Sequence, residues 1–273
     1  MDEYLLTIKP IELTRQRRKQ QQALCTDQDK KDFLGLTGSL NFLGHGVLPQ
    51  ASFIASHLQQ SLGHLTVGYL CTANKCLQEM RSLRPMLKYV QPTSIQSPTF
   101  VGFSDASQGK TSYGQTGYVS GIHISAKGGG IFYLVDWLSG KQGRVSFSSI
   151  GAEILAAATL ADRGSMTAES IQLLVNFDDN LPFVLTVDSI SLYSTITTLS
   201  EGSDYRICPT VARLRDSFEN RDISTMQWIP GADNLADALT ERNVSMFAKL
   251  NKIAKTGNLL PSTLNEAKRA KFQ

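Results

Sequence analysis

TFVGFS, at residues 99–104, is the stretch where the apolar residues of this chain change from helical spacing to the pattern of a strand. Two more runs of this kind follow at residues 118–124 and 131–137, and three glycines at residues 128–130 separate them. Runs rich in β-branched and aromatic residues that glycine interrupts are typical of a β-hairpin. We therefore expect three consecutive antiparallel strands here.

Helices and strands alternate after this hairpin. The Ala- and Leu-rich stretch from Gly151 to Arg163 predicts a helix, and the short apolar run Phe183–Val187 predicts a buried strand. The sequence then predicts two helices, a strand and a last helix, at residues 191–199, 210–219, 225–229 and 233–240. Antiparallel strands followed by alternating elements predict an α/β domain, with a mixed five-stranded sheet flanked by helices.

The residues before residue 99 predict a small helical region. Thr26 has the position of an N-cap with Asp29 three residues on, and the apolar spacing that follows predicts a helix from about 27 to 43. Two further apolar-periodic stretches, up to Leu83, predict two more helices. We expect residues 1–31 to be irregular, because their basic and polar run is too hydrophilic for a core.

A Pro- and Ser-rich joint at residues 91–98 divides the chain. We expect a helical, connection-like region within residues 1–95, the α/β domain at residues 96–245, and a basic tail at residues 246–273. The three parts carry 11, 10 and 6 Lys and Arg against 7, 16 and 1 Asp and Glu. An acidic centre between basic flanks suits cation binding in the middle and polyanion binding at the ends. Chance clustering on a solvated surface is an equal alternative.

Several classes of protein are excluded by composition. No stretch approaches the roughly 18 uncharged apolar residues of a spanning helix, and the N-terminus lacks the layout of a signal peptide. The four cysteines form no CxxC pair, and no two of His45, His57 and His64 share a helical turn, so we expect neither a zinc site nor a disulfide framework. An intracellular location, cytoplasmic or nuclear, without a membrane partner, is the expectation.

Four carboxylates lie where the expected strands end or helices begin. Asp105 follows the first strand, Glu153 lies in the first turn of the Ala-rich helix, Asp188 ends the buried strand, and Asp237 lies in the last helix. Carboxylates brought together next to apolar strand ends repel one another unless a cation neutralises them. Oxygen ligands suit Mg²⁺ or Mn²⁺, and two such ions about 3.5–4 Å apart support phosphodiester hydrolysis.

The four carboxylates lie in the motifs FSDAS (103–107), SSIGAEILA (148–156), LTVDS (185–189) and WIPGADNLADAL (228–239). This set resembles the four successive motifs of the ribonuclease H domain of retroelement reverse transcriptases, and most of all that of copia-type LTR retrotransposons. FLGLTGSLNFL (33–43) is similar to the segment that follows the polymerase palm in copia-type polyproteins. The resemblance implies a ribonuclease H-like fold and covers most of the chain.

The resemblance also implies an activity and a set of residues. The activity is metal-dependent cleavage of the RNA strand of an RNA/DNA hybrid, leaving a 3′-hydroxyl and a 5′-phosphate, with the four carboxylates as ligands of two Mg²⁺ ions. Ser107 and Ser149 would contact the minor groove of the hybrid, where only RNA offers a 2′-hydroxyl. Lys141 and Arg144 would contact phosphate, which carries no sequence or sugar information. The upstream polymerase domain of the same polyprotein would be a second partner.

The sequence also departs from the family. The approach to Asp237 contains no histidine, residues 165–180 form an insertion, and no aromatic-x-Asp-Asp polymerase motif is present, so the chain looks like the C-terminal part of a longer polyprotein. One alternative is a non-catalytic or decayed retroelement fragment that keeps the fold and binds nucleic acid or a protein partner. Another is a nuclease of the same superfold, such as an integrase-like transferase.

Overall fold

The computed structural model describes residues 2–83, 87–89, 98–108, 114–126, 129–146, 148–175, 181–198, 205–259 and 268–270. The chain divides into two compact units, one of Met1–Leu87 with Ser139–Lys141 and one of Lys88–Leu138 with Gln142–Gln273. The Pro- and Ser-rich joint lies outside the described residues except for Pro98. No helix among the described residues is long and apolar enough to cross a membrane.

The first unit contains the three helices that the sequence predicts. They are α3 (Asp27–Gly46), α4 (Pro49–Gln59) and α5 (Val67–Leu83), with one 3₁₀ turn, η1 (Leu62–His64), before α5. The predicted start at Thr26 is confirmed, because Thr26 and Asp29 form a capping box. The helices pack through fully buried side chains such as Phe33 and Leu70.

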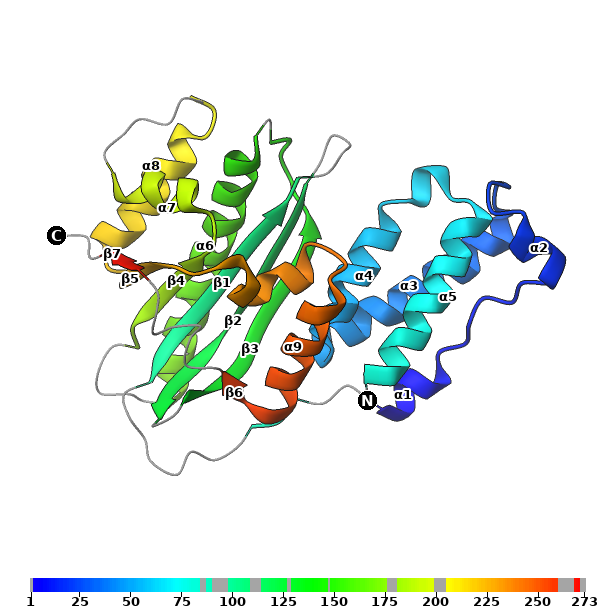
Figure 1. Cartoon of the computed structure of the whole chain (residues 1–273), viewed down its shortest axis with the longest axis horizontal. Coiled ribbons are helices and arrows are strands. Elements are labelled where there is room, and N and C mark those ends of the chain that lie inside the picture. The colour runs from blue at the N-terminus through cyan, green and yellow to red at the C-terminus, as the bar shows by residue number, and fades with distance from the viewer. Residues whose placement is uncertain are drawn as a thin grey trace. The chain divides into compact units, whose positions relative to one another are not determined.

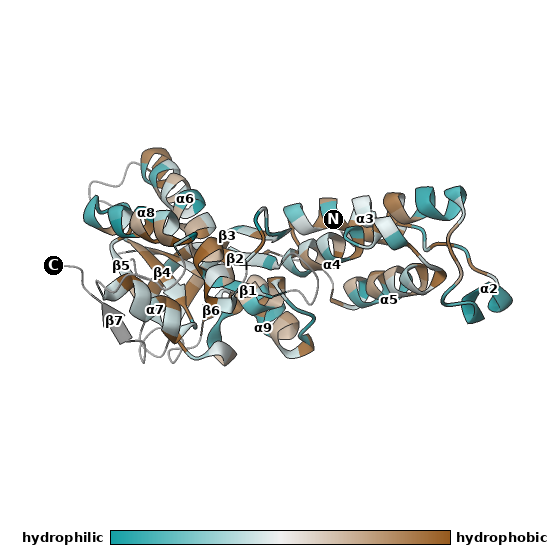
Figure 2. Ribbon diagram, turned by 90° about the horizontal axis from the view of Figure 1, so that it is seen from above, coloured by the Kyte–Doolittle hydropathy of each residue, from teal (hydrophilic) through white to brown (hydrophobic). Residues whose placement is uncertain are grey.

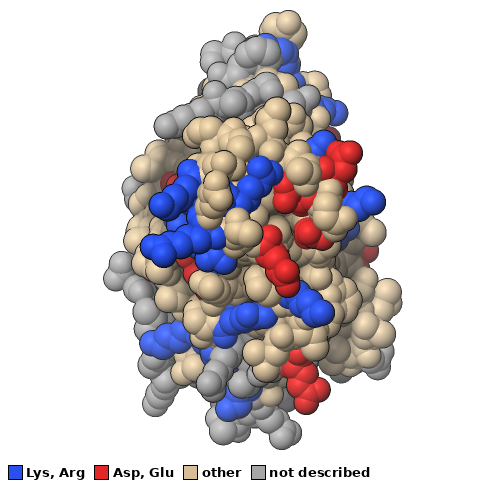
Figure 3. All heavy atoms as spheres, turned by 90° about the vertical axis from the view of Figure 1, so that its right-hand side faces the viewer, with Lys and Arg blue, Asp and Glu red and all other residues tan. Residues whose placement is uncertain are grey.

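The prediction that residues 1–31 are irregular is wrong in part. Two short helices, α1 (Asp2–Thr7) and α2 (Arg15–Lys19), lie within this segment. The chain between them is held to α5, because the Asn74 amide bonds both the N–H and the carbonyl of Ile11, each at 2.8 Å. α2 is hydrophilic in Figure 2. Figure 3 views the chain from the side on which α2 lies in Figure 1, and shows Lys and Arg side chains gathered beside Asp and Glu side chains.

The second unit is built on a mixed sheet, shown in Figure 1. Its strands are β1 (Thr99–Ser107), β2 (Gln115–Ala126), β3 (Gly129–Lys141), β4 (Phe183–Val187), β5 (Thr225–Trp228), β6 (Asn258–Leu259) and β7 (Lys268–Ala270). The order across the sheet is β6-β3-β2-β1-β4-β5-β7. β1 pairs antiparallel with β2 and parallel with β4, and β4 pairs parallel with β5. The expected mixed sheet is confirmed, with two short edge strands added to the five predicted ones.

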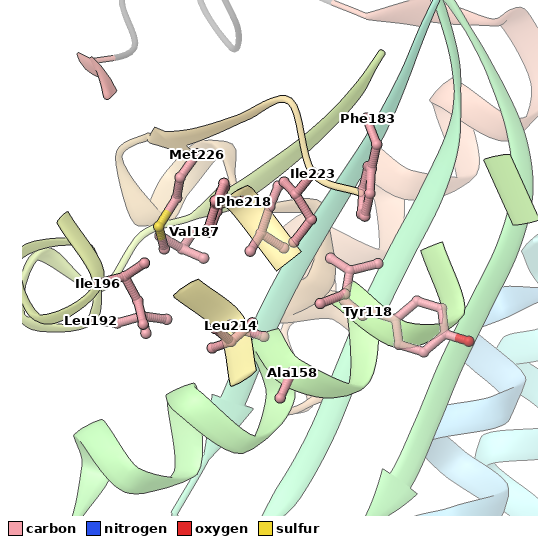
Figure 4. Packing of buried hydrophobic residues seen from close by; sticks show 14 of the residues in the cluster. Tyr118, Ala158, Phe183, Val187, Leu192, Ile196, Leu214, Phe218, Ile223 and Met226 are labelled. Carbon is pink, nitrogen blue, oxygen red and sulfur yellow. The ribbon is translucent and has the colours of Figure 1, made fainter. Parts of the chain in front are cut away.

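Helices cover both faces of this sheet. α6 (Ser149–Val175) and α8 (Cys208–Glu219) lie on one face and α9 (Val244–Thr256) on the other, while α7 (Ile190–Thr197) packs against α6 and α8. Figure 4 shows side chains from the strands meeting those of the helices in one core, among them Phe183, Leu192 and Leu214. The mixed α/β fold class predicted from the sequence is therefore confirmed.

Three boundaries differ from the predictions. α6 runs on to Val175, so much of the expected insertion is helix, and residues 176–180 lie outside the described residues. The last predicted helix is two 3₁₀ turns, η2 (Gly231–Asp233) and η3 (Leu235–Leu239). The expected basic tail begins instead with α9, an amphipathic helix that buries Met246, Phe247 and Leu250. Its lysines lie between these apolar positions, which is why the segment reads as a charged tail by composition.

α6 lies very close to the sheet at Gly164. A Cβ atom on Gly164 would lie 2.5 Å from the ring of Phe183 on β4. We expect Gly164→Ala to lower the free energy of unfolding by about 1–3 kcal/mol, as overpacking does in other cores. Urea unfolding followed by tryptophan fluorescence measures this, since both tryptophans, Trp137 and Trp228, lie in the second unit.

Gly143→Ala is the matched control, because a Cβ there meets nothing within 4 Å. Equal unfolding midpoints for the Gly164 variant and the wild type would show that the helix-to-sheet contact is looser than described.

Candidate metal centre

The strand register brings two of the predicted carboxylates to the same level. Phe103 on β1 is paired with Thr186 on the parallel strand β4. Two residues further along both strands, this register places Asp105 beside Asp188. Asp105 lies within β1, not after it as predicted, because the antiparallel ladder with β2 continues to Ser107. Asp188 follows β4 directly, as predicted.

Glu153 joins this pair from α6. The helix begins at Ser149, so Glu153 lies in its second turn and not in its first. Asp105, Glu153 and Asp188 each offer a carboxylate oxygen, and these atoms all lie within 4.8 Å of one another. Asp237, on η3, is outside this group of three, but its charge interacts with those of Asp105 and Asp188. The structure therefore brings three of the four predicted carboxylates together and leaves the fourth beside them.

Neutral side chains from one segment, residues 234–243, hold three of the carboxylates. The Thr240 hydroxyl donates to Asp105 Oδ2. The Asn243 amide donates to Asp237 Oδ2 at 2.9 Å. Asn234 hydrogen-bonds Asp188, and its amide also donates to the carbonyl of Ser104 on β1 at 2.9 Å. This segment thus joins the last motif to the strands that carry the first and third.

Burial raises the pKa of every carboxylate in the cluster, and neighbouring charges raise it further for Glu153, Asp105 and Asp237. Desolvation and then the charges of Asp105 and Asp188 raise the pKa of Glu153 to about 9. Desolvation likewise raises the pKa of Asp105 to about 7, although the Thr240 hydrogen bond opposes this shift. The pKa of Asp237 is raised to about 6, by desolvation and then by Glu241, and the pKa of Asp188 is raised by desolvation.

The cluster fits a divalent cation of the hard, oxygen-binding kind. All its donors are carboxylate oxygens, which suit Mg²⁺ or Mn²⁺. Glu153 Oε2 is buried and has no hydrogen-bond partner among the described residues. A buried polar atom of this kind normally has a partner, so an unpartnered oxygen on a carboxylate that lies close to two others fits the role of a metal ligand.

The expected nucleic-acid contacts come from several different elements. Ser107, at the end of β1, donates its hydroxyl to the carbonyl of Thr240 at 2.9 Å. Ser149 is exposed at the start of α6. Lys141, at the end of β3, and Arg144, in the loop that follows, are exposed.

The sequence patterns gave no sign that Asn234, Thr240 and Asn243 contact the carboxylates. The two asparagines precede η3 and α9 and cap them, so their positions signal helix starts and not contacts with carboxylates. Thr240 follows η3 and matches no motif, and its partner Asp105 is far away in sequence. No local pattern of residues could have revealed that contact.

Comparison of the sequence with protein-family models and with curated proteins gives no match. Among solved structures, the chain is similar to RNase H1 from Halobacterium salinarum, at 20% identity over 52% of this chain and 93% of that one, with a TM-score of 0.38. LC11-RNase H1 in complex with an RNA/DNA hybrid is similar at 14% identity over 52% and 93%, with a TM-score of 0.37. The protease-reverse transcriptase of prototype foamy virus is 13% identical over 62% of this chain and 22% of that one, with a TM-score of 0.33.

Proposed function

We propose that the chain is a metal-dependent ribonuclease H that hydrolyses the RNA strand of RNA/DNA hybrids. The observation that carries the proposal is the meeting of Asp105, Glu153 and Asp188 within 4.8 Å, from a strand, a helix and a strand end that are distant in sequence. The resemblance of their surrounding motifs to those of retroelement ribonuclease H domains supports the same reaction.

Asp105, Glu153 and Asp188 would hold the metal, with Asp237 as a fourth ligand at the edge of the group. When bound, two Mg²⁺ ions, or Mn²⁺ in their place, would activate a water and stabilise the leaving oxygen of an in-line phosphodiester displacement. Hydrogen bonds from Thr240 to Asp105, from Asn243 to Asp237 and from Asn234 to Asp188 hold three of these carboxylates, and the pairing of β1 with β4 places Asp105 beside Asp188.

Hydroxyl groups at the edge of the site could distinguish RNA from DNA. Ser107 uses its hydroxyl proton on the carbonyl of Thr240, so its oxygen is left as an acceptor for a 2′-hydroxyl. Ser149 is exposed and can both donate and accept. Lys141 and Arg144 would bind phosphates of either strand and add affinity without selectivity.

The biological setting that we propose is reverse transcription of a copia-type retroelement. The four motifs and the segment at residues 33–43 support this setting, and the polymerase domain upstream in the polyprotein would be the natural partner. A non-catalytic or decayed fragment that only binds nucleic acid or a protein is the alternative. Hybrid binding without cleavage would favour the alternative.

A cleavage assay tests the proposal. The purified chain is incubated with an end-labelled RNA/DNA hybrid, and in parallel with a DNA duplex and an RNA duplex of the same sequence. We expect Mg²⁺- or Mn²⁺-dependent cleavage of the RNA strand of the hybrid alone, with 3′-hydroxyl products and complete loss of activity in chelator. Cleavage that persists in chelator, or equal cleavage of all three duplexes, would contradict the proposal.

A further inference from the structure

Thr240 occupies a central place in the candidate metal centre. It lies directly after η3 and is 3% exposed. Its hydroxyl donates to Asp105 Oδ2 on β1, and its carbonyl accepts the Ser107 hydroxyl at 2.9 Å. Thr240 donates one of these hydrogen bonds and accepts the other, so the residue directly after the last motif is tied to two residues of the first motif.

The packing of Thr240 against β2 fixes it further. Gly117 is the cross-strand neighbour of Asp105, and a Cβ atom on Gly117 would lie 2.7 Å from Thr240 Cγ2. The Thr240 methyl group thus fills the space that a side chain at residue 117 would take. Its hydroxyl donates to Asp105 Oδ2 and makes a longer contact, at 3.3 Å, with the carbonyl of Asp237.

A hydrogen bond from Thr240 has a definite consequence for Asp105. The carboxylate has two oxygens with about four acceptor positions, and the hydroxyl occupies one of those on Oδ2. The backbone N–H of Ala106 also bonds this carboxylate, and the acceptor positions that are left can face a cation. Rotation of the carboxylate would cost the hydrogen bond of a buried group. Mutation of a group that hydrogen-bonds a metal ligand typically costs about 10–100-fold in metal affinity.

We propose that Thr240 is a positioning residue of the metal centre, which orients the Asp105 carboxylate toward Glu153 and Asp188. This inference rests on the proposed function, because it assumes that the three carboxylates bind a divalent cation. None of the described hydrogen bonds of Thr240 reaches the carboxylate of Glu153 or Asp188.

The position of Thr240 differs from that of an ordinary buried threonine. Thr37, on α3, is fully buried too, but its hydroxyl bonds the carbonyl of Phe33 in the same helix. The Thr37 hydroxyl therefore satisfies only its own polar group. Because the two threonines are similarly buried, Thr37→Val is a matched control for removing a buried hydroxyl.

Binding of Mn²⁺ to the full, metal-free chain tests the inference, measured by the electron paramagnetic resonance signal of free Mn²⁺ without nucleic acid. We expect Thr240→Val to weaken Mn²⁺ binding by about 10–100-fold. Thr240→Ser keeps the hydroxyl and is expected to bind within about threefold of the wild type, and Thr37→Val is expected to bind like the wild type.

Wild-type affinity in the Thr240→Val chain would overturn the inference, as would binding in the Thr240→Ser chain that is as weak as in the valine variant. If the valine variant does not fold, Ser107→Ala decides, because it removes only the bond that anchors the Thr240 carbonyl. Ser107→Ala is expected to weaken Mn²⁺ binding severalfold, and unchanged affinity would overturn the inference.

A wild-type chain that binds no Mn²⁺ would contradict the proposed function and the inference together, whereas normal binding by all variants would contradict the inference alone.

Discussion

Asp105→Asn is expected to lower the rate of RNA cleavage in an RNA/DNA hybrid by more than about 100-fold. Asp105 is 9% exposed and lies among the three clustered carboxylates. Changes to groups that merely orient a metal ligand typically cost about 10–100-fold, so removal of the ligand charge should cost more. The measurement is single-turnover cleavage of a labelled hybrid in saturating Mg²⁺.

Asp216→Asn is the matched control for this variant. Asp216 is exposed on α8, outside the cluster, and the substitution makes the same chemical change. We expect its cleavage rate to equal that of the wild type. Wild-type activity in the Asp105 variant, with folding confirmed by circular dichroism, would mean that the reaction takes place elsewhere on the chain.

Glu153→Gln is expected to stabilise the metal-free chain at pH 7.5, by about 1–3 kcal/mol, while it abolishes cleavage. Burial and the neighbouring charges raise the pKa of Glu153 to about 9 in the folded chain, far above its value in the unfolded chain. One pKa unit corresponds to about 1.4 kcal/mol of differential stability between the protonated and ionised forms. The glutamine side chain of the variant would occupy the same space without having to take up a proton on folding at this pH.

The pH dependence of this effect has a definite sign. A group whose pKa is raised on folding stabilises the fold fully below its unfolded pKa, and the contribution is lost as the pH rises through the folded pKa. In chelator, the wild type should therefore lose stability from about pH 4.5 to pH 9 through Glu153, and the variant should lose less. The gain from Glu153→Gln should be small at pH 5 and large at pH 7.5.

Chemical denaturation at both pH values measures the difference, with Glu169→Gln as the control, an exposed glutamate on the same helix. Added Mg²⁺ should stabilise the wild type and have little effect on the Glu153 variant. A Glu153 variant that is less stable than the wild type in chelator at pH 7.5 would contradict this prediction.

Local patterns were enough to predict the central architecture. The strands β1 to β5 and the helices α3 to α8 follow from runs of apolar residues at strand or helix spacing, broken by glycine and proline. The meeting of Asp105 with Asp188 was expected from the resemblance of their motifs, whereas the parallel pairing of β1 with β4 that produces it had no signal in the local patterns.

Contacts that depend on distant pairing were not predictable. β6 is two residues long and exists because Asn258 and Leu259 pair with β3. The composition of α9 is that of a basic tail, and its apolar positions become evident only once they are buried in the second unit. Thr240 has no local signal at all, since its role depends on a carboxylate 135 positions earlier in the chain.

Anomalous scattering from Mn²⁺ tests the central claim most directly. Crystals of the chain grown in chelator and then soaked in Mn²⁺ would be measured near the manganese absorption edge. The account predicts anomalous density between the carboxylates of Asp105, Glu153 and Asp188, with Asp237 at its edge. Crystals saturated with Mn²⁺ that show no density at these carboxylates, or that show it only elsewhere on the chain, would contradict it.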